Sequence, residues 1–153
     1  MHLEIGGGTL ASPDAYNLDA NPAHATPGWN RFAQQAPWPC DDGTFDTIKA
    51  SHVMEHIPAG VDRITVMNEA YRALKPGGQF TIIVPGIVAR NAGEFLGWWA
   101  IADPTHVSFW LPESFHYFDG TFAANADYGI RIWNTVSLDI KDGWEITWIG
   151  THD

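Results

Sequence analysis

Short apolar runs and one longer periodic segment organise the chain. Runs rich in β-branched and aromatic residues, bounded by Gly, Pro and Asp, predict strands at 2–5, 15–18, 30–33, 45–50 and 80–84. Between the last two runs, apolar residues recur every three or four positions, which predicts an amphipathic helix with the stripe Val61, Ile64, Met67, Tyr71 and Leu74. Lys75-Pro76-Gly77-Gly78 ends this helix, because glycine and a cation favour a helix C-terminus.

The C-terminal part alternates apolar and polar residues on both sides of Asp142-Gly143. Asp-Gly tolerates the positive φ angles of a tight turn, so this pattern predicts an antiparallel β-hairpin. Residues 89–120 are expected to form helical pieces and loops. Strand, helix, strand and terminal hairpin together predict an α/β fold with an open, mostly parallel sheet in a single domain, 1–153.

Composition narrows the range of partners. The chain has 153 residues and a net charge of −10, from 8 Lys and Arg against 18 Asp and Glu. This balance argues against nucleic acid and against an anionic membrane surface, and it is compatible with a cationic or neutral small-molecule ligand. Cys40 is the single cysteine, so no intrachain disulfide forms. No apolar run approaches the ~20 residues of a membrane span and no signal peptide is evident, so we expect a cytoplasmic protein.

A glycine triplet follows the first predicted strand and suggests a ligand-binding turn. Gly6, Gly7 and Gly8 permit a close backbone approach, and Asp19 at the end of the next strand can accept hydrogen bonds from ribose hydroxyls. The alternative interpretations are an ordinary loop and a loop acid that caps the Asn21-Pro22 turn. Gly6, Gly8 and Ala11 also fit a dinucleotide pattern, but Ser12-Pro13-Asp14 leaves little room for the required helix.

Several motifs then occur in a recognisable order. They are Glu4-Ile5-Gly6-Gly7-Gly8, Asn17-Leu18-Asp19, Asp42-Gly43-Thr44-Phe45-Asp46, His52-Val53-Met54-Glu55-His56-Ile57 and Leu74-Lys75-Pro76-Gly77-Gly78. In this order the chain resembles the class I S-adenosylmethionine-dependent methyltransferases over residues 3–86. The resemblance implies a Rossmann-like sheet. The chain departs from the family by lacking the usual N-terminal helix and most of the helix between the first two strands.

The resemblance also implies a cofactor site for S-adenosylmethionine. Glu4, Gly6 and Gly8 would line its methionine part, Asp19 would hold the ribose, and Ser51 and His52 would lie near the sulfonium. The complete set of expected cofactor-binding residues is Glu4, Gly6, Gly7, Gly8, Asp19, Ala20, Phe32, Ser51 and His52.

Histidines supply the candidate chemistry. His52-Val53-Met54-Glu55-His56 matches the H-x-x-E-H pattern of a zinc-protease family, but Pro58 shortens any helix there, so we expect no metal. Asp103-Pro104-Thr105-His106 lies between two aromatic clusters. We expect His106, oriented by Asp103, to act as base or acceptor-binding residue, with His52 as the second catalytic candidate. A loop histidine capped by Asp103 is the alternative.

These observations predict methyl transfer to a small-molecule or saccharide acceptor. A non-catalytic cofactor-binding or scaffold protein with the same fold is the alternative, and a nicotinamide-dependent oxidoreductase is disfavoured by the missing helix. Because a parallel sheet needs both faces covered, the missing helices also predict a homodimer.

Overall fold

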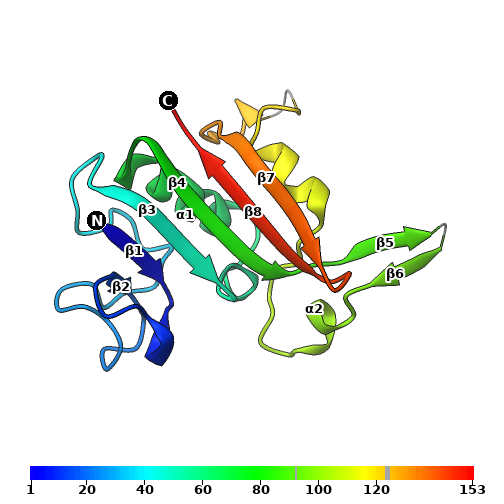
Figure 1. Cartoon of the computed structure of the whole chain (residues 1–153), viewed down its shortest axis with the longest axis horizontal. Helices are drawn as coiled ribbons and strands as arrows, with labels where there is room; N and C mark the ends of the chain where they lie inside the picture. The colour runs from blue at the N-terminus through cyan, green and yellow to red at the C-terminus, as the bar shows by residue number, and fades with distance from the viewer. Residues whose placement is uncertain (92, 123–124) are drawn as a thin grey trace.

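The main sheet of the computed structural model has six strands, and the structure describes residues 1–91, 93–122 and 125–153. The strands are β1 (His2–Ile5), β2 (Tyr16–Leu18), β3 (Phe45–Ser51), β4 (Leu74–Pro85), β7 (Asn134–Lys141) and β8 (Glu145–Thr151). Their order is β2-β1-β3-β4-β8-β7 (Figure 1). The first four strands are parallel, while β8 is antiparallel to both β4 and β7. The predicted open, mostly parallel sheet with a terminal hairpin is therefore confirmed.

The hairpin turn forms at the predicted dipeptide. Asp142 and Gly143 have φ angles of 53° and 76°, the left-handed conformation that a two-residue primed turn requires. Gly143 adopts this conformation without strain, and Asp142 belongs to the few residue types that tolerate it.

Two predicted segments differ in the structure. Residues 30–33 form no strand: Asn30 makes a single bridge to Asp19, and its side-chain amide donates to the carbonyls of Asp19 and Ala20. The 89–120 region is not only helical pieces and loops. It begins with a separate hairpin of β5 (Val88–Asn91) and β6 (Glu94–Leu96), which extends beyond the end of the main sheet (Figure 1). The remainder contains α2 (Trp99–Ala102) and η3 (Pro112–Tyr117).

The predicted helix is α1 (Val61–Ala73), but its buried face is shifted from the predicted stripe. Val61 is 78% exposed in the first turn, and Leu74 already belongs to β4. The buried residues of α1 are Val66, Met67, Ala70 and Ala73. Two of these four residues are alanines, and the predicted stripe missed them because it was based on large apolar residues.

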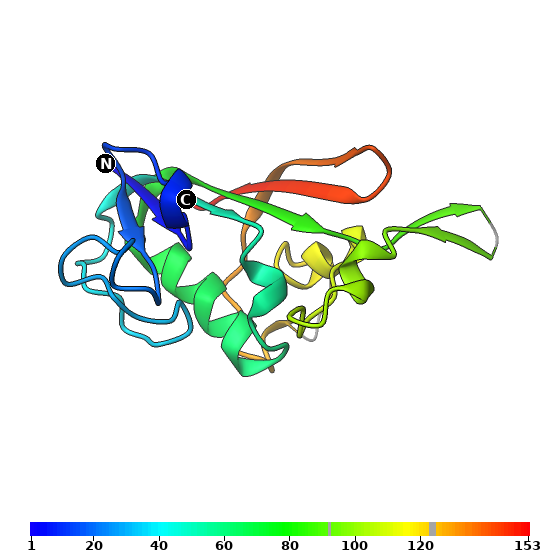
Figure 2. The ribbon, with the colours of Figure 1, turned by 90° about the horizontal axis from the view of Figure 1, so that it is seen from below.

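The helices gather on one side of the sheet. Figure 2 shows α1, η2 (Met54–His56) and η3 beneath β4 and β8. The core lies in this layer, where Ile48, Phe80, Ile82 and Trp148 are fully or almost fully buried. Among the described residues no helix covers the opposite face of β4 and β8 (Figure 2). Between β1 and β2 the connection holds one helical turn, η1 (Gly8–Leu10).

The described residues contain no helix long and apolar enough to cross a membrane.

Candidate functional site

The glycine turn after β1 is shaped by two separate constraints. Gly6 has a φ of 62°, and a Cβ there would lie 2.6 Å from a methyl of Val53. Gly8 has a φ of 54°, while a Cβ there would meet nothing within 4 Å. Gly6 is therefore required by packing and conformation, and Gly8 by conformation alone. Open space beside Gly8 is what a ligand approaching this backbone needs.

A cavity of about 260 Å³ lies at the end of β1 and β3. Its lining includes the predicted residues Glu4, Gly6, Gly7, Ser51 and His52. Burial alone raises the pKa of Glu4, but hydrogen bonds from the Ser12 hydroxyl and backbone N–H outweigh it, so the pKa is lowered. The carboxylate therefore stays charged beside the turn.

Lys49 also lines this cavity, and the sequence analysis did not identify it. Lys49 on β3 is the register partner of Glu4 on β1, so both side chains point to the same face of the sheet. A lysine between Ile48 and Ala50, near the end of a predicted buried strand, was the available signal. The ammonium supplies a partner for an anionic ligand group such as a carboxylate.

The second cavity has a volume of about 460 Å³ and lies at the end of β1 and β2. Asp19, Ala20, Phe32 and His52 contribute to its wall. The Asp19 carboxylate accepts from Gly8 N–H at 3.1 Å and from Asn21 N–H at 2.8 Å, one bond to each oxygen. Each oxygen keeps a further lone pair, enough to receive two vicinal hydroxyls. The arrangement thus fits an adenosine group, with apolar side chains beside the acid.

The third cavity, of about 410 Å³, brings together the 99–106 segment and the end of the sheet. Its lining includes His52, Trp99, Asp103, His106 and Trp144. The three predicted catalytic residues therefore share one cavity. Trp144 is a further wall residue that the sequence analysis had placed only in the hairpin.

His52 is the residue common to all three cavities. Its φ of 54° is unusual for a non-glycine residue, and its N–H donates to the Ile83 carbonyl at 2.8 Å. The ring lies between two carboxylates, with Nδ1 3.5 Å from Glu55 and Nε2 3.1 Å from Glu145. Glu55, opposed by burial and assisted by Glu145, raises the pKa of His52. Glu145 lies 93 positions away on β8, so no local pattern could reveal it.

His106 is held by the backbone rather than by Asp103. Its Nδ1 lies 3.0 Å from the Ala100 carbonyl, and its side chain is only 9% exposed. Asp103 accepts instead from the Thr105 N–H and hydroxyl, and the hydroxyl bond in particular lowers the pKa of Asp103. The second Asp103 oxygen is 3.7 Å from Nε2 of His106. Asp103 therefore adds negative charge near the ring, while Ala100 orients it.

Among the described residues, Gly8 is the one predicted cofactor residue outside the walls of these cavities, and it reaches the site through its bond to Asp19. Trp110 is fully buried, whereas Trp98 and Trp99 are 59% and 53% exposed and stack on each other.

Comparison with known proteins agrees with this architecture. The methyltransferase domain family matches residues 2–117, about three quarters of the chain. The chain belongs to this family. No curated protein matches it by sequence.

Solved structures share the fold over nearly the whole chain. A SAM-dependent methyltransferase from Archaeoglobus fulgidus superposes with a TM-score of 0.65 at 13% identity, over 98% of this chain and 85% of its own. One from Methanosarcina mazei gives a TM-score of 0.62 at 14% identity, over 99% and 91%. A chain from a Haloferax volcanii complex with the Trm112 methyltransferase activator gives 0.60 at 16% identity, over 98% and 81%. The family predicted from the sequence is confirmed, and S-adenosylmethionine is the cofactor that it implies.

Proposed function

We propose that this methyltransferase-family chain transfers a methyl group from S-adenosylmethionine to a small-molecule or saccharide acceptor. The observation that carries the proposal is the position of His52, which borders all three cavities. Cofactor and acceptor bound on either side of His52 would meet at the carboxyl ends of the parallel strands, where open α/β sheets bind ligands.

The cofactor would extend across the first two cavities. Asp19 would accept hydrogen bonds from the ribose hydroxyls, with Ala20 and Phe32 beside the adenosine. The methionine part would lie along Gly6, Gly7 and Ser51, with its carboxylate near Lys49. Glu4 would support the turn through Ser12.

The acceptor would occupy the third cavity. The cofactor supplies a methyl carbon activated by the adjacent sulfonium. The acceptor oxygen or nitrogen would form the new bond to carbon, sulfur would keep the electron pair of the broken carbon–sulfur bond, and the acceptor's proton would pass to His106. Because Nδ1 of His106 faces a carbonyl, which only accepts, this nitrogen carries the hydrogen and Nε2 carries the lone pair. His106 therefore presents an acceptor-binding atom, with the Asp103 carboxylate nearby and Trp99 in the wall of the same cavity.

A nicotinamide dinucleotide fits this site less well than S-adenosylmethionine does. A pyrophosphate is normally held at the N-terminus of the helix that follows the glycine turn. Here that connection holds only the three-residue turn η1.

Isothermal titration with S-adenosylhomocysteine tests the cofactor assignment. Asp19→Ala should weaken binding by about 10- to 100-fold, because a hydrogen bond to a charged group contributes about 1.5–3 kcal/mol. Asp14→Ala removes an exposed acid from the same connection and should bind like the wild type. NAD should not bind. Equal affinity of Asp19→Ala and the wild type would remove Asp19 from the site.

Turnover separates catalysis from simple cofactor binding. With labelled S-adenosylmethionine and a panel of hydroxyl- and amine-bearing acceptors, the wild type should transfer the label. His106→Ala should retain cofactor binding and lose about 10²-fold or more of the transfer rate. Tight cofactor binding without transfer to any acceptor would favour the scaffold alternative.

We retain the homodimer as a proposal, because no described helix covers one face of β4 and β8. Sedimentation at tens of micromolar should show a dimer, and a clean monomer would contradict it.

A further inference from the structure

Three potential metal ligands from two distant segments come together beside the proposed acceptor cavity. They are Glu55 and His56 in η2 and His106 in the 103–106 loop. One ligand atom of each lies within 4.8 Å of the others. Bonds of about 2.0–2.2 Å at tetrahedral angles place ligand atoms about 3.4 Å apart, so side-chain rotations that bring the three atoms closer together would close the set.

Glu55 is an unusual residue for a structural turn. Its side chain is 2% exposed, and Oε2 is buried without a hydrogen-bond partner among the described residues. A buried carboxylate oxygen without a partner is costly, since removing a charge from water is compensated only by pairing or metal binding. The other oxygen, Oε1, lies 3.5 Å from Nδ1 of His52. Oε2 therefore remains free to accept a further ligand.

Both histidines are held in the tautomer that binds metals through Nε2. Nδ1 of His56 lies 3.1 Å from the Thr105 carbonyl, and Nδ1 of His106 lies 3.0 Å from the Ala100 carbonyl. A carbonyl accepts only, so each Nδ1 donates its hydrogen and leaves a lone pair on Nε2. Metal-binding histidines are typically oriented in this way by a backbone carbonyl or carboxylate.

The two segments are also tied together by their backbones. The N–H groups of Val107 and Ser108 donate to the Glu55 carbonyl at 2.9 and 3.1 Å, and the Ser108 hydroxyl donates to the Met54 carbonyl. This framework sets His106 opposite η2, with the two histidine rings 5.0 Å apart. A ligand set held on such a framework loses little conformational freedom when an ion binds.

We propose that Glu55, His56 and His106 form a binding site for a zinc-like divalent transition-metal ion. Two imidazole nitrogens and one carboxylate oxygen are a common three-residue set for such ions, which then keep an open coordination position. The H-x-x-E-H pattern suggested a pair of His52 and His56. In the structure His52 instead pairs with Glu145, and His106 is the second histidine beside His56.

The site also extends the proposed function, and this step rests on it. His56 lines the proposed adenosine cavity and His106 lines the proposed acceptor cavity. An ion here would let His106 act on the acceptor through the metal. An acceptor hydroxyl bound at the open position would release its proton more readily than one in water.

Zinc titration of the tag-free, chelator-treated full chain tests the site without any activity measurement. The wild type should bind one Zn²⁺ per chain, and Co²⁺ in its place should give the visible absorption of a four-coordinate ion. Glu55→Gln and His106→Gln should each weaken binding by about 100-fold or more, because outer partners of metal ligands alone contribute about 10- to 100-fold. His116→Gln is the matched control, since His116 pairs with Asp119 outside the cluster.

Thermal unfolding without metal establishes that each variant is folded. If Glu55→Gln fails to fold, His56→Gln on the more exposed side of the cluster replaces it. Absence of stoichiometric binding in the wild type, or equal binding by the wild type and the ligand variants, overturns the proposal. S-adenosylhomocysteine titration of the metal-free chain shows separately whether the cofactor site stands.

Discussion

The 20–44 connection lies between β2 and β3 and the 87–128 segment lies between β4 and β7, and the two differ in how far their tryptophans are buried. In the first, Trp29 and Trp38 are buried in the core. In the second, Trp98 and Trp99 expose more than half of their surface, while Trp110 is buried. The first connection therefore completes the core, whereas part of the second forms a wall of the proposed acceptor cavity.

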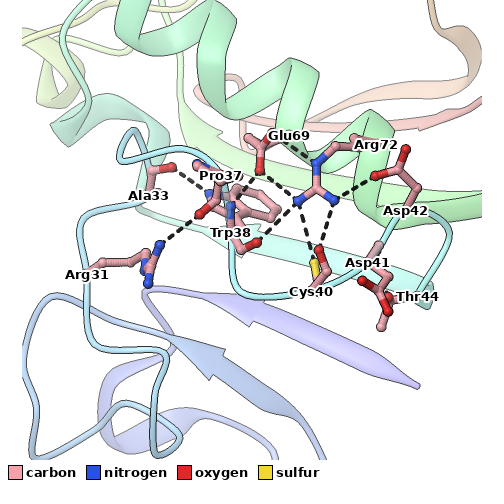
Figure 3. Close-up of polar contacts among 10 residues, drawn as sticks. All are labelled: Arg31, Ala33, Pro37, Trp38, Cys40, Asp41, Asp42, Thr44, Glu69 and Arg72. Atoms are coloured by element: carbon pink, nitrogen blue, oxygen red, sulfur yellow. Dashed lines mark hydrogen bonds and ion pairs between the residues drawn. The ribbon is translucent and has the colours of Figure 1, made fainter.

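A polar network on α1 fixes the first connection (Figure 3). The Arg72 guanidinium donates to Glu69, to the Asp42 carboxylate and to the carbonyls of Trp38 and Cys40. Glu69 in turn accepts from the Trp38 N–H at 2.7 Å. Backbone groups that a helix would have satisfied internally are thus satisfied by two side chains of α1.

The second segment is anchored mainly near its middle. Val107 and Ser108 bond to Glu55, and Trp110 forms a bridge with Gly86. On either side of these anchors lie exposed apolar residues such as Ile101 and Tyr128. Stability should therefore depend strongly on the first connection, whereas the exposed residues of the second segment should affect ligand selection more than stability.

The largest expected effect comes from Trp38→Ala. The ring is 2% exposed and its Nε1–H donates to the Ala33 carbonyl, so truncation leaves a cavity and an unpaired acceptor. We expect a loss of about 3–5 kcal/mol in the free energy of unfolding, measured by urea denaturation. Trp98→Ala in the second segment should cost less than about 1.5 kcal/mol, the upper value for an aromatic pair. Similar losses in the two variants would break the comparison.

Arg72→Ala should have the next largest effect. It removes the ion-pair partner of Glu69 and the guanidinium donor of two carbonyls, so we expect a loss of about 2–4 kcal/mol in the free energy of unfolding, between exposed and buried ion pairs. Arg90→Ala is the control, because Arg90 and Glu94 form an exposed, 3.9 Å pair in the second segment. That control should stay within about 0.5 kcal/mol of the wild type. A urea midpoint of Arg72→Ala equal to that of the wild type would show that the network contributes nothing to stability.

Acid should weaken the polar network that holds the first connection. Burial raises the pKa of Glu69, but hydrogen bonds from Arg72 and the Trp38 N–H outweigh it and lower the pKa. A carboxyl with a lowered pKa stabilises the fold above its unfolded pKa of about 4.3, and this contribution is lost as pH falls through the folded pKa. Between pH 6 and pH 3 the wild type should therefore lose more stability than Glu69→Gln. Equal losses in the two proteins would exclude Glu69 as a source of acid sensitivity.

Features set by neighbouring residues could be predicted from the sequence, whereas contacts between distant residues could not. Strands such as β1 and β4 carry their own local pattern, and the Asp142-Gly143 turn is specified by two residues, so these were predicted. The glycine turn and Asp19 are close in sequence, and the structure joins them by a hydrogen bond. Other contacts join residues that are 32 to 93 positions apart and meet only in the folded chain. They are the pairs His52 with Glu145, Cys40 with Arg72, and Glu55 with His106. No periodicity marks such pairs, so the sequence could suggest their chemistry but not their partners.

The smallest expected effect on stability is the one that most sharpens the comparison. Trp98 and Trp99 stack with ring centroids 3.5 Å apart, so removal of either ring destroys the same contact. Trp98→Ala and Trp99→Ala should therefore lose similar amounts of stability, each below about 1.5 kcal/mol. Only Trp99 lines the third cavity, so only Trp99→Ala should raise the KM for the acceptor in the labelled-methyl assay. S-adenosylhomocysteine affinity should be unchanged in both variants, since neither ring borders the other two cavities. Equal KM values in the two variants would mean that the exposed tryptophans do not select the acceptor.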